Sequence, residues 1–267
     1  MSTPLRIERR PSGVTVLTFA LPERRNAMTS DLTDAWTSAV AELRADADLR
    51  AVVVTGEGTA FCAGGDLSWI GESNDLTVAK IRDRMLPFYR AWLAIRDVEV
   101  PTIAAINGHA IGAGLCVALA CDLRYAAAGA RMSVPFTSLG IHSGMAATYL
   151  LPATVGITNA RELLFTGRRV DAAEALRLGL VNGVVDGDPA GPGGVVEHAL
   201  EIAEQIAANG PIAVRLTVAA LRNGTPRSLD DALMYEALAQ PITFASEDLM
   251  EGLAAAKERR APKFTGK

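Results

Sequence analysis

The stretch PTIAAINGHAIGAGLCVALACDLRY, residues 101–125, joins in sequence the signals of a strand, a bend, a helix and a second strand. PTIAAI (101–106) is a short apolar run, the pattern of a strand that is buried on both faces. Three glycines crowd the bend that follows, and a helix of small residues, 115–121, leads into the strand candidate DLRYAA, 122–127. This order predicts a layered α/β domain with at least partly parallel strands.

The same order recurs on the N-terminal side of this stretch. VTVLTF (14–19) and AVVVT (51–55) are β-rich runs, and residues 31–46 between them have the spacing of an amphipathic helix. Ser30 is the expected N-cap of that helix. A further helix is predicted over residues 78–97.

The C-terminal part reads differently. Residues 186–195 (DGDPAGPGGV) are the clearest linker in the chain. Nearly everything beyond them is helical in pattern, with breaks expected at Pro211, Pro226 and Pro241; the expected helices are 196–208, 211–223, 229–237 and 246–258. We therefore predict a core over residues 1–195 and a helical appendage, residues 196–267, of the kind that supports oligomerisation.

Composition excludes several classes of protein. The 267 residues carry a net charge of −4, which argues against a nucleic-acid partner. Three cysteines in no C-x-x-C pair argue against a disulfide scaffold or a structural zinc site and favour a reducing, cytoplasmic location. The N-terminus is polar, and no apolar run approaches the roughly 20 residues of a membrane span, so no export signal or membrane association is expected.

Two glycine-rich bends are candidates for chemistry. FCAGGD (61–66) and NGHAIGAG (107–114) each follow a buried strand. Backbone that carries few side chains can approach a ligand closely, and two N–H groups from different loops can form an oxyanion hole. The alternative is a pair of ordinary tight turns. Neither bend matches G-x-G-x-x-G or a P-loop, so nucleotide binding of those kinds is not indicated.

Taken together, these segments resemble the enoyl-CoA hydratase/isomerase (crotonase) superfamily. The resemblance extends over nearly the whole chain, in five segments: 22–28 (PERRNAM), 61–67 (FCAGGDL), 101–125, 160–181 (ARELLFTGRRVDAAEALRLGLV) and 251–264 (EGLAAAKERRAPKF). It implies a crotonase-like spiral of ββα units with a C-terminal helical trimerisation region. It also implies a homotrimer or dimer of trimers that binds an acyl-CoA thioester, with coenzyme A as part of the substrate and no metal or redox cofactor.

The resemblance assigns roles to particular residues. It implies that the N–H groups of Gly65 and Ala113 form the oxyanion hole. The residues that it implies in coenzyme A binding are Ala63 and Leu67 at the adenine and Arg25, Lys257 or Lys263 at the phosphates. The three basic residues could equally be solvated surface charges.

The chain departs from the family where a hydratase needs its two carboxylates. Those carboxylates hold a water between a base and an acid. The resemblance places the first carboxylate three positions after Ala113, where this chain has Cys116. It places the second carboxylate directly after Pro135, where this chain has Phe136.

Other residues are candidates to replace them. His142 can act as a base near pH 7, or be a histidine bonded within its loop. Cys116 can act as a thiolate, or be a small apolar filler. Glu72 and Asp83 are the nearest carboxylates in the segment 69–93, where Trp69, Met85, Phe88 and Tyr89 form either an acyl tunnel or a core stripe.

Three functions follow as hypotheses. The nominal one is an enoyl-CoA hydratase or isomerase, an enzyme that stabilises a thioester enolate. The loss of both carboxylates favours a non-hydratase acyl-CoA binding or carrier protein instead. A thioester hydrolase or decarboxylase that uses His142 is the third.

Overall fold

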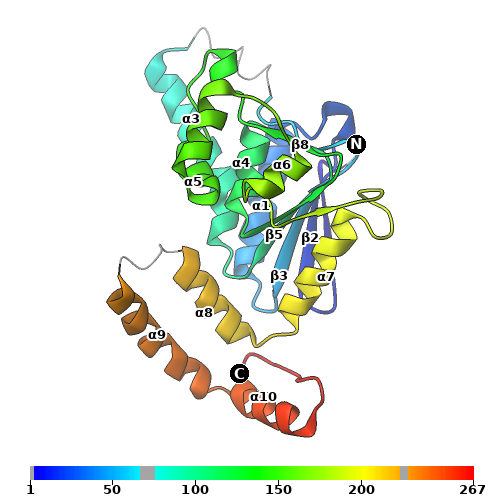
Figure 1. Ribbon diagram of the computed structural model, residues 1–267, viewed down its shortest axis with the longest axis vertical. Helices are drawn as coiled ribbons and strands as arrows, with labels where there is room; N and C mark the ends of the chain where they lie inside the picture. Colours follow the sequence, from blue (N-terminus) through cyan, green and yellow to red (C-terminus); the bar gives the residue numbers. More distant parts are fainter. Residues whose placement is uncertain (1–2, 67–75, 223–227) are drawn as a thin grey trace.

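The computed structural model describes residues 3–66, 76–222 and 228–267, and its core is built on a six-stranded sheet (Figure 1). Its strand order is β1-β2-β3-β5-β7-β10. The bounds are β1 (Leu5–Arg9), β2 (Val14–Phe19), β3 (Ala51–Gly56), β5 (Thr102–Ile106), β7 (Leu123–Ala127) and β10 (Gly183–Val185). Only β1 and β2 are antiparallel within this sheet, so the predicted parallel α/β core is confirmed.

A second sheet, of four strands, contributes one strand to each repeated unit of the fold. Its order is β4 (Ala60–Cys62), β6 (His109–Ile111), β8 (Arg131–Ser133) and β9 (Val170–Asp171). Three times, a strand of the large sheet is followed by a strand of the small sheet and then by a helix: β3–β4–α3, β5–β6–α4 and β7–β8–α5. The helices are α3 (Val78–Leu93), α4 (Ala113–Ala120) and α5 (Ala147–Thr166). These repeats are the ββα units that the sequence predicts.

Helix α1 (Ser30–Ala45) covers one face of the large sheet with the expected apolar stripe. Its Trp36 ring stacks on Trp92 of α3, with the ring centres 5.2 Å apart. The N-cap prediction is wrong by one residue. Thr29 has the extended backbone of a cap and accepts the Leu32 N–H at 3.2 Å, whereas Ser30 is already helical.

Helix α7 (Val195–Ala207) covers the opposite face of the large sheet. Its Val195, Ala199 and Ala203 are fully buried in a cluster with Val16 and Val53. The division predicted after residue 195 therefore falls at the start of a helix that packs on the core. Short helix α6 (Ala172–Arg177) leads toward β10.

The last three helices form an arm at one end of the molecule (Figure 1). They are α8 (Pro211–Arg222), α9 (Leu229–Phe244) and α10 (Glu247–Glu258). The break expected at Pro241 is absent, because α9 runs through this residue to Phe244. None of the helices in the described ranges is both long and apolar enough to cross a bilayer.

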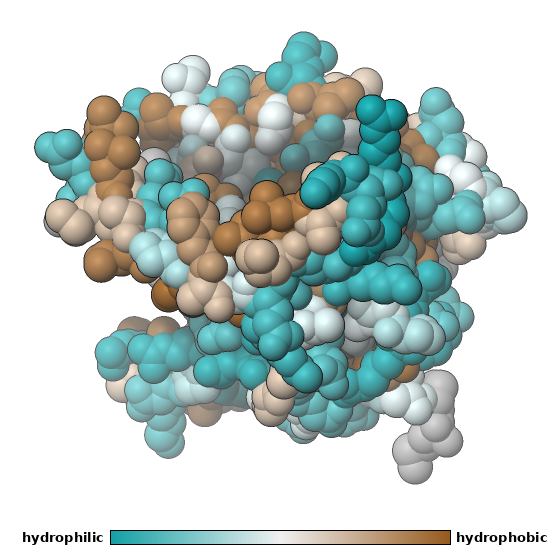
Figure 2. Space-filling view, turned by 90° about the horizontal axis from the view of Figure 1, so that it is seen from below, coloured by the Kyte–Doolittle hydropathy of each residue, from teal (hydrophilic) through white to brown (hydrophobic). Residues whose placement is uncertain are grey.

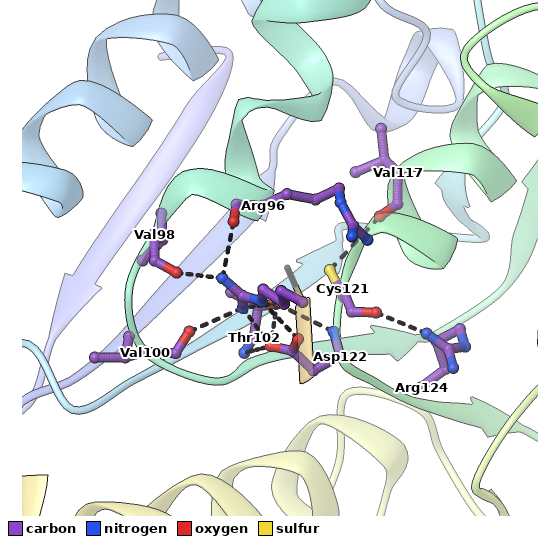
Figure 3. Close-up of polar contacts among 9 residues, drawn as sticks. Arg96, Val98, Val100, Thr102, Val117, Cys121, Asp122 and Arg124 are labelled. Carbon is purple, nitrogen blue, oxygen red and sulfur yellow. Dashed lines mark hydrogen bonds and ion pairs between the residues drawn. The ribbon is translucent and has the colours of Figure 1, made fainter. Parts of the chain in front are cut away.

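A buried arginine, Arg222, fastens this arm to the core, and Figure 3 labels its partners Val98, Val100 and Asp122. Arg222, the last residue of α8, donates hydrogen bonds to the carbonyls of Arg96, Val98 and Val100. It also pairs with both carboxylate oxygens of Asp122, at the start of β7. The Arg222 side chain is only 10% exposed, so its charge depends on these partners.

The same contact with Arg222 affects the pKa of Asp122. Burial disfavours its charged form, but hydrogen bonds and charge from Arg222, with hydrogen bonds from Thr102, outweigh burial and hold the pKa of Asp122 below its usual value. A lowered pKa means that the pair contributes stability above the unfolded value of about 3.9 and loses it as the pH falls through the folded pKa.

We expect Arg222→Met to lower the free energy of unfolding by about 3–5 kcal/mol, because it leaves three carbonyls without their donor and the partly buried Asp122 carboxylate without its charge partner. Urea denaturation at pH 7 measures this. Arg44→Met is the matched control, since the Arg44–Asp97 pair is exposed and 3.8 Å long, and a loss below about 1 kcal/mol is expected. Equal losses of unfolding free energy in the two variants would contradict the conclusion that Arg222 fastens the arm to the core.

Candidate active site

The two glycine-rich bends pack against each other backbone to backbone. Gly64 has φ +94°, and a Cβ on it would lie 2.7 Å from the carbonyl oxygen of Ile111. A Cβ on Gly114 would likewise overlap the carbonyl of Cys62. Glycine is needed at both positions, because any side chain would push the loops apart.

A third segment braces these loops. Met28 donates its N–H to the carbonyl of Gly64 at 2.9 Å, and Ala63 donates to the carbonyl of Arg25 at 3.0 Å. Asn26 is fully buried and donates from its side-chain amide to the carbonyl of Ala60 at 2.7 Å. The loop that carries Gly65 is thus held on both sides by backbone contacts.

Gly65 and Ala113, the two residues that the resemblance implies as oxyanion donors, line one cavity. Ala113 is the first residue of α4, so its N–H has no partner within the helix and points from the positive end of the helix dipole. Gly112, with φ +56°, precedes it and offers no side-chain cap. Two N–H groups at one cavity wall are the arrangement that binds an oxygen gaining negative charge.

The cavity has a volume of about 490 Å³ and is mostly apolar. The apolar side chains that line it are Ile81, Met85, Phe88, Ile111, Phe136, Leu139, Ile141 and Met145. The polar side chains around it are those of Tyr89, His142 and Ser143. Among the described residues no Asp or Glu lines it, and Phe136 presents a ring where the resemblance places a carboxylate.

Cys116 lies behind this cavity rather than in its wall. It is fully buried, and its Sγ is 3.9 Å from the carbonyl oxygen of Gly144. Burial raises the pKa of Cys116 to about 12, so the thiol is protonated at neutral pH. This favours the filler interpretation of Cys116 over the thiolate.

His142 stands at the rim of the cavity and is exposed to solvent. Its Nδ1 lies 2.7 Å from the carbonyl oxygen of Ser143. The tautomer with a proton on Nδ1 donates to this carbonyl and leaves Nε2 as an acceptor. This contact matches the alternative interpretation, a histidine bonded within its own loop, and the role of His142 as a base stays a prediction.

Asp83 and Glu72 are the carboxylates that could replace the two missing ones. Asp83 is 75% exposed, lies 4.0 Å from Arg82 and does not line the cavity. Glu72, Trp69 and Leu67 lie outside the described residues. Met85, Phe88 and Tyr89 all face the cavity, as the acyl-tunnel interpretation expects, whereas Trp92 on the same helix is in the core.

A second recess, of about 410 Å³, adjoins the first at Ala63, which lines both. Four basic or titratable side chains surround it: Arg25, His109, Arg131 and Arg169. In the described part of the chain, neither Arg25 nor Arg169 forms an ion pair. Arg25 was already a candidate for phosphate binding from the sequence. Arg131 and Arg169 were not candidates, because only the pairing of β8 with β9 brings them together.

Lys257 and Lys263 lie in the C-terminal arm. Both are exposed, and neither lines either recess of its own chain. The backbone N–H of Lys263 donates to Glu251 at 2.8 Å, and Arg260 pairs with the same carboxylate. Their assignment to coenzyme A phosphates stays a prediction. The described residues contain no group of three or more potential metal ligands.

Comparison with known proteins identifies the family to which this α/β spiral belongs. Residues 9–267 match the family model described as enoyl-CoA hydratase/isomerase. The short-chain-enoyl-CoA hydratase of Clostridium acetobutylicum is 36% identical over 248 residues, 92% of each chain. Enoyl-CoA hydratase domain-containing protein 2, mitochondrial, of Mus musculus is 37% identical over 256 residues, 96% of this chain and 85% of that protein.

The fold agrees with solved structures. The crystal structure of an enoyl-CoA hydratase from Bacillus anthracis superimposes with a TM-score of 0.91 at 35% identity, covering 99% of this chain and 100% of that one. The chain belongs to the enoyl-CoA hydratase/isomerase family.

Gly64→Ala tests whether the site depends on the close approach of the loops. We expect a loss of about 1–3 kcal/mol in unfolding free energy, from the positive φ and the contact with Ile111, together with weaker binding of hexanoyl-CoA. Urea denaturation and calorimetry measure the two effects. Gly129→Ala is the control, because nothing lies within 4 Å of its Cβ position and its φ is not positive. Unchanged hexanoyl-CoA affinity in Gly64→Ala would contradict this account of the site.

Proposed function

We propose that the protein is an acyl-CoA enzyme that stabilises a thioester enolate between the N–H groups of Gly65 and Ala113. The observation that carries this proposal is that both residues line one apolar cavity, with Ala113 at the N-terminus of α4. Oxyanion donors of this kind contribute about 10²–10³ in rate each. Hydration or isomerisation of an enoyl-CoA is the nominal reaction.

The two recesses suggest how the substrate lies. An apolar acyl group fits the larger cavity, and the thioester carbonyl then reaches Gly65 and Ala113 near the neck at Ala63. The cationic recess beyond the neck suits the phosphates of coenzyme A, with Arg25, Arg131 and Arg169 as the ligands. Coenzyme A is here part of the substrate rather than a separate cofactor.

Hydration itself is expected to be weak. Adding water to a 2-enoyl thioester needs a base and an acid, and each contributes about 10²–10⁴ in rate. Cys116 and Phe136 supply neither. The same two residues favour the second candidate, a carrier that binds acyl-CoA with little turnover. The third candidate, a thioester hydrolase or decarboxylase, rests on the place of His142 in the lining of the cavity.

The loss of conjugated enoyl-thioester absorbance of crotonyl-CoA tests the nominal reaction. We expect a rate far below that of a standard hydratase run in parallel, while calorimetry still reports binding. A rate equal to the standard would show that water is activated without the two carboxylates. His142→Ala separates the remaining candidates, because thioester cleavage or decarboxylation should fall by about 10²–10⁴ only if that histidine is catalytic.

We also propose that the arm mediates self-association into a trimer or a dimer of trimers. Large apolar side chains are exposed on α9 and α10: Leu229, Leu233, Met234, Leu238, Ile242, Phe244, Met250 and Leu253. Figure 2, which views the molecule from the end where the arm lies, shows apolar residues gathered round a hollow on part of this face. Exposed apolar patches of this extent commonly mark protein interfaces.

Sedimentation equilibrium tests the assembly. We expect a mass of three or six chains of 28.1 kDa, and a smaller species for Leu238→Glu, whose side chain is 69% exposed on α9. Leu176→Glu on α6 serves as the control outside the arm. A monomeric wild-type protein would overturn the proposal.

A further inference from the structure

Tyr89 is the polar side chain that α3 presents to the acyl cavity. It lies in the same cavity wall as Gly65 and Ala113, one helical turn after Met85. Among the described residues its hydroxyl has one hydrogen-bond partner, the thioether sulfur of Met85 at 3.8 Å. A thioether is a weak acceptor, so this hydroxyl is available to a ligand.

The hydroxyl lies directly over the backbone of Gly144. A Cβ on Gly144 would overlap the Tyr89 oxygen and lie 3.0 Å from the ring carbon that bears it. The carbonyl of Gly144 is in turn the partner of Cys116 Sγ at 3.9 Å. Cys116 occupies the position where the resemblance places the first carboxylate. The phenol of Tyr89, which belongs to α3, therefore lies near the position of that missing carboxylate.

We propose that Tyr89 is a catalytic residue of this site, the group that exchanges a proton with the α-carbon of the bound acyl thioester. The inference rests on the proposed function, since it requires the enolate held by Gly65 and Ala113. It adds the proton-transfer group that Cys116 and Phe136 do not supply.

The surroundings set the protonation state of the phenol. Burial, and then the neighbouring Cys116, raise the pKa of Tyr89. The groups that face it are Met85 of its own helix, the neutral thiol of Cys116 from α4 and the 142–145 loop that carries His142. At neutral pH the phenol is therefore protonated and acts first as a donor.

The step balances without a co-reactant. The phenol gives its proton to the α-carbon of the enolate, whose electron pair forms the new C–H bond while the thioester C=O double bond re-forms. Negative charge passes from the enolate oxygen to the phenolate, which takes a proton from water. In reverse, the phenolate removes an α-proton and the oxyanion donors stabilise the enolate that forms.

Exchange of the α-hydrogens of hexanoyl-CoA in D₂O, followed by NMR, tests the proposal. We expect Tyr89→Phe to lower the exchange rate by at least about 10²-fold while hexanoyl-CoA binding stays within a few-fold. Gly144→Ala displaces the hydroxyl without removing it and should lower exchange as well. Tyr149→Phe makes the same chemical change on the exposed face of α5 and should leave exchange unchanged.

The pH profile distinguishes catalysis from a structural role. Exchange by the wild-type protein, corrected for the enzyme-free rate, should rise between about pH 7 and pH 9, because the phenolate fraction grows toward the raised pKa. Tyr89→Phe should lose this rise. Wild-type exchange that persists in Tyr89→Phe, with its rise intact, would overturn the role of Tyr89 and leave the proposed function standing. Binding of hexanoyl-CoA without exchange by the wild-type protein would overturn both.

Discussion

The contact on which the site depends is the close approach of two backbones, at Gly64 against Ile111 and at Gly114 against Cys62. Without it, the N–H groups of Gly65 and Ala113 would belong to unrelated loops. Because backbone donors need no side-chain rotamer to be fixed, the pair costs little reorganisation when an oxygen gains charge between them. The Met28 and Ala63 hydrogen bonds, together with buried Asn26, then hold one of the two loops in place.

The side chains around these two backbone N–H groups are mostly apolar. The cavity wall carries rings and aliphatic groups, and its polar groups are neutral or exposed: a protonated phenol, a hydroxyl and the rim histidine. A buried carboxylate pair would have to be desolvated and held apart, whereas Phe136 and Cys116 only fill space. Under the proposed function, the two backbone donors stabilise charge, while Cys116 and Phe136 stand where the resemblance places the carboxylates that handle water.

Much of the fold could be predicted from the sequence, because its signals are local. Continuous apolar runs gave β2, β3 and β5, and the linker at 186–195 was placed before α7. Local signals failed where two competing signals were close in strength, as at Thr29 beside Ser30, or where a helix continues through a proline, as at Pro241. Gly65 and Ala113 became candidates through family resemblance. Arg131, Arg169 and Arg222 were not, because residues far apart in the sequence give them their surroundings.

The attachment of the arm has a consequence for how the molecule opens. Arg222 takes its acceptors from the segment before β5 and from the start of β7, so α8 cannot leave as an independent unit without stranding a charge on each side. Local opening of α8 and of the N-terminal ends of β5 and β7 should then form one cooperative unit, with similar hydrogen-exchange protection in both. Among the described residues, the hydrogen bonds and ion pairs of α9 and α10 join residues within the arm, so Arg222 is the buried charge that ties this arm to the sheet.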